Sequence, residues 1–425
     1  MDAEKGERAE EGEMTLVFET DEVIVLRRIQ SPRILPPDAE VGPGTEHLTR
    51  GVAATYGLPD FVFRSKVYSS GSRNREVGDA VVIAGRFGAA IQVKARETPS
   101  SEPKREESWL NQGIKKGLRQ ATGTIRRLSG SAHTLINERG REVEIDGQSM
   151  SWVPVVVLDH PNPPRDYTPW SLVDRLGVVI LRRDWEFLFE QLKSTHAVVQ
   201  YLHRIGDTEP VRLGTEPARY YELAAVDAAA QPTPQEPWLA ELGGDPWSSP
   251  LLPMTPAGSG DEAHHKLLRM IMEDLAIAPR PQEVEEAQLL EVLAALDTLP
   301  IAMRSDIGGL LMEWLENVTT FKSQGVKWQL RRVISPAGPH LIFAAATLWT
   351  LDVQTAFSIL VQLRHQQLVE VSDRADDLTS IGILLTPRYD GVRQWDTTMI
   401  RVRGELHLEL EERRDMEFLW PLPPS

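Results

Sequence analysis

The pattern of apolar and polar positions predicts a mixed α/β arrangement in the first half of the chain. Short apolar or alternating runs bounded by turn residues are typical of strands, whereas apolar positions three or four apart indicate helices. Strands or hairpins are expected at Thr15–Arg28, Phe61–Tyr68, Val77–Ala84, Ala89–Ala95, Ser151–Leu158 and Val178–Arg182. Helices are expected at Gly44–Tyr56, Lys104–Leu128 and Trp185–Ile205, the last with Asp184 as its N-cap. The order helix, three strands, helix, strand predicts a mixed sheet covered by helices.

The second half of the chain has a different pattern. Seven prolines lie between Gln231 and Pro256, with glycines nearby, so a linker is expected over residues 224–261. Amphipathic helices are expected beyond it at Asp261–Ile277, Gln282–Leu299, Ile301–Val318, Pro339–Thr350 and Val353–Val371. Two alternating runs, Ile381–Thr386 and Thr398–Leu410, predict a closing β-hairpin.

These patterns divide the chain into four predicted parts. They are a disordered acidic tail (1–14), an α/β domain (15–210, with its core at 44–158), the linker (224–261) and a mainly α-helical domain that ends in the hairpin (262–425). A length of 425 residues also favours two or three domains, because one hydrophobic core rarely serves so long a chain.

Composition narrows the class of protein. An apolar share of 41% and a charged share of 25% are ordinary for a soluble folded protein. No apolar run approaches the roughly 18 residues that a membrane span needs, and the acidic start lacks the pattern of a secretion signal, so a cytoplasmic protein is expected. The absence of cysteine excludes disulfides, thiolate zinc sites and cysteine nucleophiles, so any metal is expected on oxygen or imidazole. The histidines show no metal-ligand spacing and are expected to be surface or core residues.

Charge is distributed unevenly. The chain carries a net charge of −16, yet the segment from Phe61 to Gly130 holds fourteen Lys/Arg and six Asp/Glu, a balance of +8 that leaves −24 for the rest. Phosphate binding needs such a local excess of positive charge. The candidates for nucleic-acid backbone contacts are Lys115, Lys116, Arg119, Arg126 and Arg127. A solvated helix surface is the alternative interpretation.

Two neighbouring strands carry the candidate chemistry. Asp79 opens one predicted strand, and Gln92 follows thirteen residues later in the next, with Lys94 two positions beyond. Residues two apart on a strand share a face, so an antiparallel pair can bring one carboxylate, one amide and one ammonium group together. Asp79 as a turn residue, with Gln92 and Lys94 on a solvated strand face, is the alternative.

Such a set of groups suits phosphodiester cleavage. A divalent ion held by oxygen ligands can bind the scissile phosphate and help to form the attacking hydroxide. Asp79 is expected to be the anionic ligand, Gln92 to offer its carbonyl oxygen, and Lys94 to stabilise developing negative charge. Glu46, on the preceding helix, is the candidate for a further carboxylate ligand. The expected metal is Mg²⁺ or Mn²⁺.

The run VGDAVVIAGRFGAAIQVKAR resembles the PD-(D/E)XK nuclease superfamily, in particular the branch of the Mrr-type restriction endonucleases, which has glutamine before x-Lys. The resemblance covers about a quarter of the chain, from Gly44 to Leu158. It implies that Asp79, Gln92 and Glu46 bind metal and that Lys94 is the catalytic lysine. The sequence departs from the family pattern in having Gly-Asp for Pro-Asp and an amide for the second acid.

The expected function is that of a metal-dependent endonuclease, acting on DNA in defence or DNA processing. The C-terminal domain is expected to sense a trigger, to choose a substrate, or to bind a partner protein or further copies of the chain. Two alternatives stay open: a nuclease-derived module that binds nucleic acid or protein without cutting, and a ribonuclease with the same site.

Overall fold

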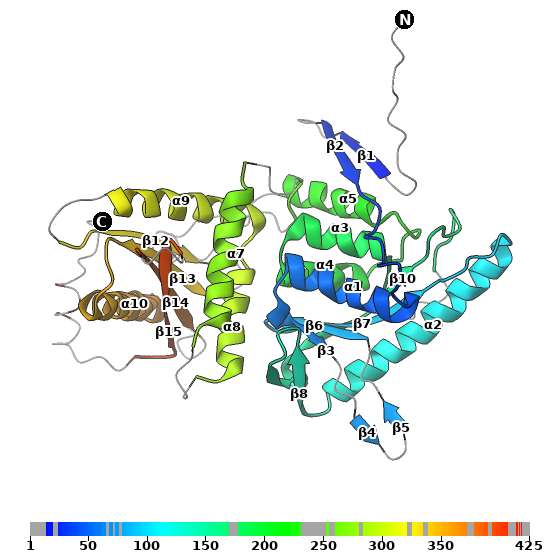
Figure 1. The fold of residues 1–425 in the computed structure, drawn as a ribbon, viewed down its shortest axis with the longest axis horizontal. Coiled ribbons are helices and arrows are strands. Elements are labelled where there is room, and N and C mark those ends of the chain that lie inside the picture. The colour runs from blue at the N-terminus through cyan, green and yellow to red at the C-terminus, as the bar shows by residue number, and fades with distance from the viewer. Residues whose placement is uncertain are drawn as a thin grey trace, which may run out of the picture. The chain divides into compact units, whose positions relative to one another are not determined.

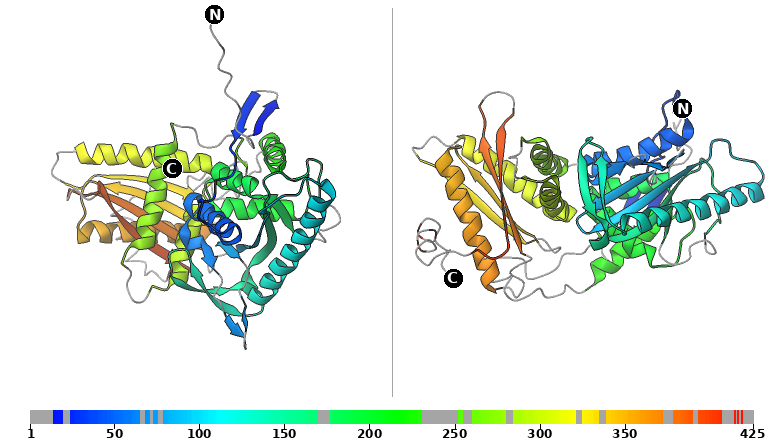
Figure 2. Two further views of the ribbon diagram at one scale, coloured as in Figure 1. Left: turned by 45° about the vertical axis from the view of Figure 1, so that its right-hand side comes forward. Right: turned by 90° about the horizontal axis from the view of Figure 1, so that it is seen from below.

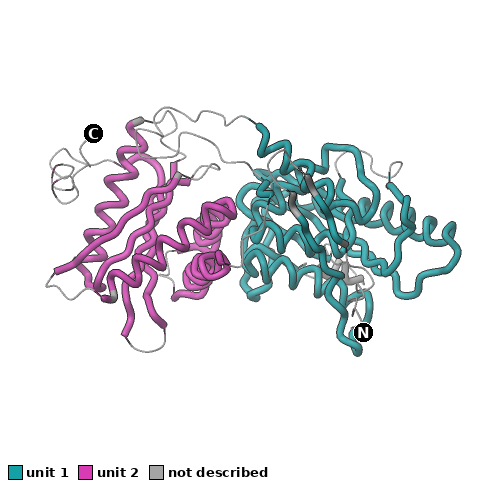
Figure 3. Tube along the Cα trace, turned by 90° about the horizontal axis from the view of Figure 1, so that it is seen from above, with its two compact units in different colours: residues 1–230, 251–256 teal, residues 231–250, 257–425 magenta. Residues whose placement is uncertain are grey.

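The computed structural model contains two compact units (Figure 3). One comprises residues 1–230 and 251–256, the other residues 231–250 and 257–425. The structure describes residues 14–19, 24–64, 68–70, 73–75, 79–169, 177–230, 252–254, 260–279, 284–320, 325–334, 339–371, 378–389, 393–406, 414, 416 and 418. The expected acidic tail lies outside these residues except for Met14, which begins a strand.

A seven-stranded mixed sheet is the centre of the N-terminal unit (Figure 1). Its strands, in spatial order, are β11 (Val178–Leu181), β10 (Ser151–Asp159), β7 (Phe87–Ala95), β6 (Ala80–Ala84), β3 (Val62–Arg64), β8 (Ala132–Asn137) and β9 (Glu142–Asp146). The strands β3, β6 and β7 are antiparallel neighbours, as expected, whereas β7, β10 and β11 are parallel. Two separate hairpins are β1 (Met14–Glu19) with β2 (Ile24–Ile29), and β4 (Tyr68–Ser70) with β5 (Arg73–Arg75).

Helices cover both faces of this sheet. The helices of the N-terminal unit are α1 (Val41–Tyr56), α2 (Pro103–Leu128), α3 (Arg182–Leu192), α4 (Thr195–Gly206) and α5 (Glu216–Ala229). Ile91 and Val93 of β7 join a core with α1, α3 and α4. The opposite face packs on α2, where Leu110 and Ile114 contact Val156 of β10. Alternate residues of β7 and β10 therefore point to different helices, as the strand period requires.

Three features of this unit differ from expectation. The hairpin of β8 and β9 stands between α2 and β10, where no strand was predicted. The single helix expected at Trp185–Ile205 is two helices, because Lys193 adopts a left-handed φ of 47° and ends α3. Ser194 then caps α4 by accepting a hydrogen bond from Ala197 N. Asp184 is not an N-cap: it lies in the first turn of α3, which is preceded by Leu181.

The N-terminal unit continues beyond residue 210. Helix α5 runs through Ala224, the expected start of the linker, and buries that residue in the core. Leu252 is also buried, and Pro253 O accepts a hydrogen bond of 2.9 Å from the Tyr220 hydroxyl. Most of the expected linker lies outside the described residues.

The C-terminal unit is a sheet between helices. Its strand order is β12 (Trp328–Ile334), β13 (His340–Ala346), β14 (Thr379–Pro387) and β15 (Trp395–Arg403). Its helices are α7 (Glu262–Ile277), α8 (Glu286–Asp297), α9 (Ile301–Thr320) and α10 (Leu351–Val371). Helix α10 packs on one face of the sheet, and α7 and α9 lie on the other side (Figure 2).

Four of the five helices predicted for the second domain are confirmed, as α7, α8, α9 and α10, whereas its four-stranded sheet was predicted only as a closing hairpin. The error arises at 339–350, where the helix-like run HLIFAAA forms β13, with all seven residues buried. A strand that is covered on both faces shows no alternation, so its pattern resembles that of a buried helix. The closing hairpin is confirmed by β14 and β15, although residues 407–410 lie outside the described part. No described helix is long and apolar enough to cross a membrane.

Candidate active site

The antiparallel pair β6 and β7 brings three of the predicted site residues together. Ala80 pairs with Ile91, so Asp79 lies opposite the residues that follow Ile91. Val93 N donates a hydrogen bond of 2.7 Å to Asp79 Oδ2. The Lys94 Nζ atom lies 3.7 Å from the same Oδ2 and 3.4 Å from Gln92 Oε1.

Lys94 is held inside a set of oxygen atoms. Its Nζ donates to Val93 O at 2.8 Å, in addition to its contacts with Asp79 and Gln92. Burial lowers the pKa of Lys94, and the charge of Lys116 lowers it further, while the carboxylates of Asp79 and Glu46 oppose that shift. The ammonium group of Lys94 is thus surrounded by the Asp79 carboxylate and by the carbonyl oxygens of Gln92 and Val93.

Gln92 is 1% exposed, which rules out a solvated strand position for this residue. Its Nε2 donates to Ile91 O at 3.3 Å, and its Oε1 accepts from Lys94. Burying an amide costs free energy unless its polar atoms find partners, and here both find them. The oxygen of Gln92 is therefore oriented towards the lysine and the site.

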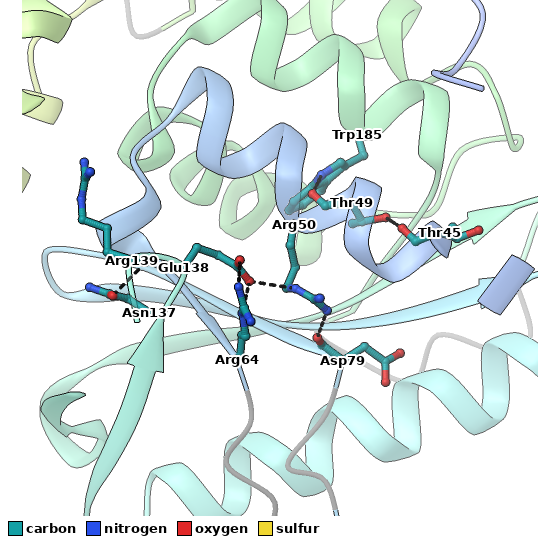
Figure 4. A network of polar contacts seen from close by, with 9 residues as sticks. All are labelled: Thr45, Thr49, Arg50, Arg64, Asp79, Asn137, Glu138, Arg139 and Trp185. Carbon is teal, nitrogen blue, oxygen red and sulfur yellow. Dashed lines mark hydrogen bonds and ion pairs between the residues drawn. The ribbon is translucent and has the colours of Figure 1, made fainter. Parts of the chain in front are cut away.

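Helix α1 borders the site from the other face of the sheet (Figure 4). Arg50 donates to Asp79 O at 3.2 Å and to Glu138 Oε1 at 2.9 Å, which fixes the start of β6. One turn earlier, Thr45 Oγ1 donates to Asp159 Oδ2 at the end of β10. Glu46 lies between these two positions on the helix, and its charge reaches Lys94.

Helix α2 presents its basic residues to solvent. The five predicted backbone contacts, Lys115, Lys116, Arg119, Arg126 and Arg127, are all exposed. None of them forms an ion pair with a carboxylate in the described part of the chain. A Cβ on Gly117 would stand 2.8 Å from Val156 Cγ2, so the glycine permits a close approach of this helix to β10. A Cβ added at Gly113 would stand 3.9 Å from Lys94 Cβ, an ordinary van der Waals distance, so this turn of α2 lies beside Lys94 without needing glycine.

A buried ionic cluster joins α2 to the end of β7. Glu106, 4% exposed, receives hydrogen bonds from Arg96 at 2.7 and 3.0 Å and lies 2.7 Å from His160 Nε2. The bonds from Arg96 hold the pKa of the Glu106 carboxyl down at about 2. Arg96 also stacks over the Trp109 ring. No sequence pattern indicates this cluster, because its members are up to 64 residues apart.

A pocket of about 330 Å³ opens at the carboxyl ends of β10 and β11. Asp159, the register partner of Ala95, lies on its wall and holds Arg182 at 3.1 Å. The arginines that line the pocket are Arg165, Arg182, Arg183 and Arg212. They are dispersed in the sequence and meet only because β10 and β11 are parallel neighbours, so the charge pattern alone could not have revealed them.

The donor atoms at Asp79, Gln92 and Glu46 are of the kind that Mg²⁺ selects. This ion is commonly held by one or two carboxylates, with water and substrate phosphate completing its shell. Among the described residues, no three His, Cys, Asp or Glu side chains form a group that could hold a metal ion. Asp79 and Gln92 fit an open site in which water and substrate complete the shell, and the described residues do not form a closed cage of acidic and histidine ligands.

Comparisons with known proteins found no matching family model, no matching curated protein and no matching solved structure.

Proposed function

We propose that the N-terminal unit is a metal-dependent nuclease that hydrolyses phosphodiester bonds, with DNA as the preferred substrate. The observation that supports it most is the meeting of Asp79 Oδ2, Gln92 Oε1 and Lys94 Nζ, within 3.7 Å of the ammonium nitrogen, at one end of β6 and β7. Lys115 and Lys116 are exposed on the part of α2 that lies beside this end, next to Gly113 and Gly117, and supply the local positive charge that a polyanionic substrate needs. Arg126 and Arg127 lie further along the helix, near the start of β10.

In this proposal each residue has a distinct task. Asp79, Gln92 and Glu46 would hold Mg²⁺ or Mn²⁺, which supplies positive charge to polarise the scissile phosphate and to ease deprotonation of the attacking water. Lys94 donates hydrogen bonds to the charge that develops on the phosphate. The exposed lysines and arginines of α2 bind backbone phosphates without reading bases.

A module that binds nucleic acid without cutting is the second candidate. It is favoured by the position of Lys94, whose ammonium group already neutralises Asp79 and donates hydrogen bonds to Gln92 Oε1 and Val93 O. In that case the lysine takes the place of a metal ion.

Cleavage assays distinguish the two candidates. Labelled plasmid, single-stranded DNA and RNA are incubated with the full chain in Mg²⁺, in Mn²⁺ or in EDTA, with Asp79→Asn purified in parallel as a control for contaminating nuclease. The nuclease proposal predicts cleavage that needs metal and is lost in the variant. Binding without cleavage in every metal would favour the second candidate, and cleavage of RNA alone would change the substrate class.

A further inference from the structure

The interface between α10 and the sheet of the C-terminal unit changes from apolar to polar at one end. Phe357 and Val361 of α10 pack with Ile342 of β13 in a hydrophobic cluster. The next turn of α10 carries Arg364 and His365 on this face. The sheet carries His340 of β13 beside them, paired in register with Ser380 of β14. All four are buried. Polar residues at such positions need partners, because burying them unpaired is costly.

A single chain of hydrogen bonds connects most of these groups. Arg332 Nε donates to His340 Nε2 at 3.2 Å, and His340 Nδ1 lies 2.9 Å from Ser380 Oγ. His365 Nδ1 lies 2.9 Å from the same Oγ, and its Nε2 lies 2.7 Å from Gly404 O. Residues that are 72 positions apart in the sequence thus form one buried network.

The positions of the protons in this network follow from the carbonyl oxygen of Gly404, at which it ends. Gly404 O can only accept, so His365 Nε2 carries a proton, and burial lowers the pKa of both histidines, which makes each of them neutral. His365 Nδ1 therefore accepts from the Ser380 hydroxyl, whose oxygen accepts from His340 Nδ1. His340 Nε2 is left to accept from Arg332, and no member of the network carries negative charge.

Two arginines of this cluster lack a counter-ion. Arg364 is 8% exposed and donates to Gln367 Oε1 at 3.0 Å, and Arg332 Nη2 is buried without a hydrogen-bond partner. Neither arginine forms an ion pair with a carboxylate in the part of the chain that the structure describes. Burial, together with the charge of Arg364, lowers the pKa of Arg332 to about 10. Within the described residues, both positive charges are therefore without a carboxylate partner.

Other buried arginines of this protein are neutralised. Arg304 in the same unit, 6% exposed, donates to Asp297 Oδ1 at 2.9 Å. Arg182 in the N-terminal unit has Asp159 at 3.1 Å and Glu186 at 2.7 Å. A buried charge without a partner is strongly destabilising, so the cluster around Arg332 differs from these neutralised pairs.

We propose that Arg332 and Arg364 bind the phosphate group of a ligand, at the α10 face of the sheet beside His340. Two guanidinium groups present planar sets of N–H donors that match the oxygens of a doubly charged phosphate. Arg332 is only half-buried, so part of its side chain faces solvent. The neutral chain from His340 to Gly404 holds the Arg332 side chain through its Nε and leaves the other N–H donors of the guanidinium for the ligand. This site does not depend on nuclease activity in the N-terminal unit.

Hydrogen exchange of the full chain, followed by mass spectrometry, tests the site. Exchange is compared at constant ionic strength in chloride and in inorganic phosphate, for peptides from β12, β13 and the second half of α10. At a phosphate concentration ten times the dissociation constant, amides that exchange through unfolding of this region should slow about tenfold. A mononucleotide and a short DNA duplex as further probes distinguish a free phosphate compound from a nucleic-acid backbone.

Variants separate a ligand site from a structural role. Arg364→Gln and Arg332→Gln should abolish the effect of phosphate and, in chloride, should exchange no faster than the wild type, because each removes an unneutralised charge. Arg331→Gln removes an equal charge from the adjacent, exposed position of β12 and should keep the full effect. Equal exchange of the wild type in chloride, phosphate, mononucleotide and duplex would overturn the proposal, as would an unchanged phosphate effect in Arg364→Gln.

Discussion

At the scale of single residues, the proposed role of Gln92 as a metal ligand depends on its contact with Lys94. It is neutral, and its oxygen already accepts from Lys94 at 3.4 Å. A metal ion near Asp79 would compete with the ammonium group for this oxygen. The affinity for metal should therefore respond to the charge at position 92.

Substitutions of Gln92 in opposite directions test this role. Gln92→Glu adds a carboxylate beside Asp79 and should preserve or tighten Mn²⁺ binding, whereas Gln92→Leu removes the oxygen and should weaken it by about tenfold to a hundredfold. Calorimetric titration with Mn²⁺ measures both. Equal affinities in the two variants and the wild type would remove Gln92 from the metal site.

Asp184 gives the N-terminal unit a specific dependence on pH. It is fully buried in the first turn of α3, with Arg183 Nε at 3.6 Å from Oδ1, and burial raises its pKa from 3.8 to about 7. The native state thus binds a proton that the unfolded state has released. The associated stability is complete below about pH 4 and is lost as the pH rises through about 7.

Asp184→Asn should remove this loss. Urea unfolding at pH 5, 6, 7 and 8 should show that the wild type declines relative to the variant, by an amount on the order of a few kcal/mol at pH 8. The change of the unfolding free energy with pH is the quantity to compare, because the asparagine amide also changes the stability by an amount that does not depend on pH. Parallel pH profiles would contradict a raised pKa at this position.

At the scale of elements, α2 connects the fold to the proposed function. It places Lys116 near Lys94 and turns the other basic residues outward. The length of the helix and its lack of internal proline made it predictable from the sequence, although glycine lowers helix propensity. The structure explains Gly117: a side chain there would overlap Val156 of β10, so this glycine allows the helix to pack close to the sheet.

Alanine substitutions at two glycines of α2 test this explanation. Gly117→Ala should destabilise the N-terminal unit by about 1–3 kcal/mol, because its Cβ would overlap Val156. Gly123→Ala, where no atom lies within 4 Å of the added Cβ, should stabilise it by about 0.5–1 kcal/mol. Urea unfolding compares them with the wild type. Similar shifts in both variants would show that α2 does not depend on close contact at Gly117.

Apolar runs and the turn residues around them predicted most strands of the N-terminal unit, whereas the hairpin of β8 and β9 was missed even though the exposure of β9 alternates. The strands that frame Asp79 and Lys94 could be predicted because turn residues bound them. Strand β13 could not, since its seven buried positions carry no period. The pair of His340 and His365 was equally hidden, because only the parallel pairing of β13 with β14 brings Ser380 between them.

At the scale of the whole molecule, each of the two units is formed by two separate stretches of the sequence. Residues 251–256 belong with the N-terminal unit, although 231–250 are assigned to the other. Leu252 is 5% exposed and joins the core that contains Tyr220, whose hydroxyl bonds Pro253 O. The proline-rich stretch predicted the approximate position of the boundary between the units, whereas its exact position depends on tertiary contacts such as those of Leu252.

Two fragments test whether this late segment stabilises the N-terminal unit. The fragment 1–256 should be more stable than 1–230 by about 2–4 kcal/mol, the sum of one buried leucine and one hydrogen bond. Thermal or urea unfolding of both fragments measures the difference. Equal stability would mean that the contacts of Leu252 and Pro253 contribute nothing to the fold.

The most direct test of the proposed nuclease is the rate of DNA cleavage by the wild type and Lys94→Ala, measured side by side in Mg²⁺ together with their affinity for the same DNA. Arg86→Ala, at the exposed turn between β6 and β7, is the control at the opposite end of these strands. The proposal predicts cleavage by the wild type and by Arg86→Ala, a loss of at least about a hundredfold in Lys94→Ala, and similar DNA affinity in all three. Wild-type turnover in Lys94→Ala would contradict it.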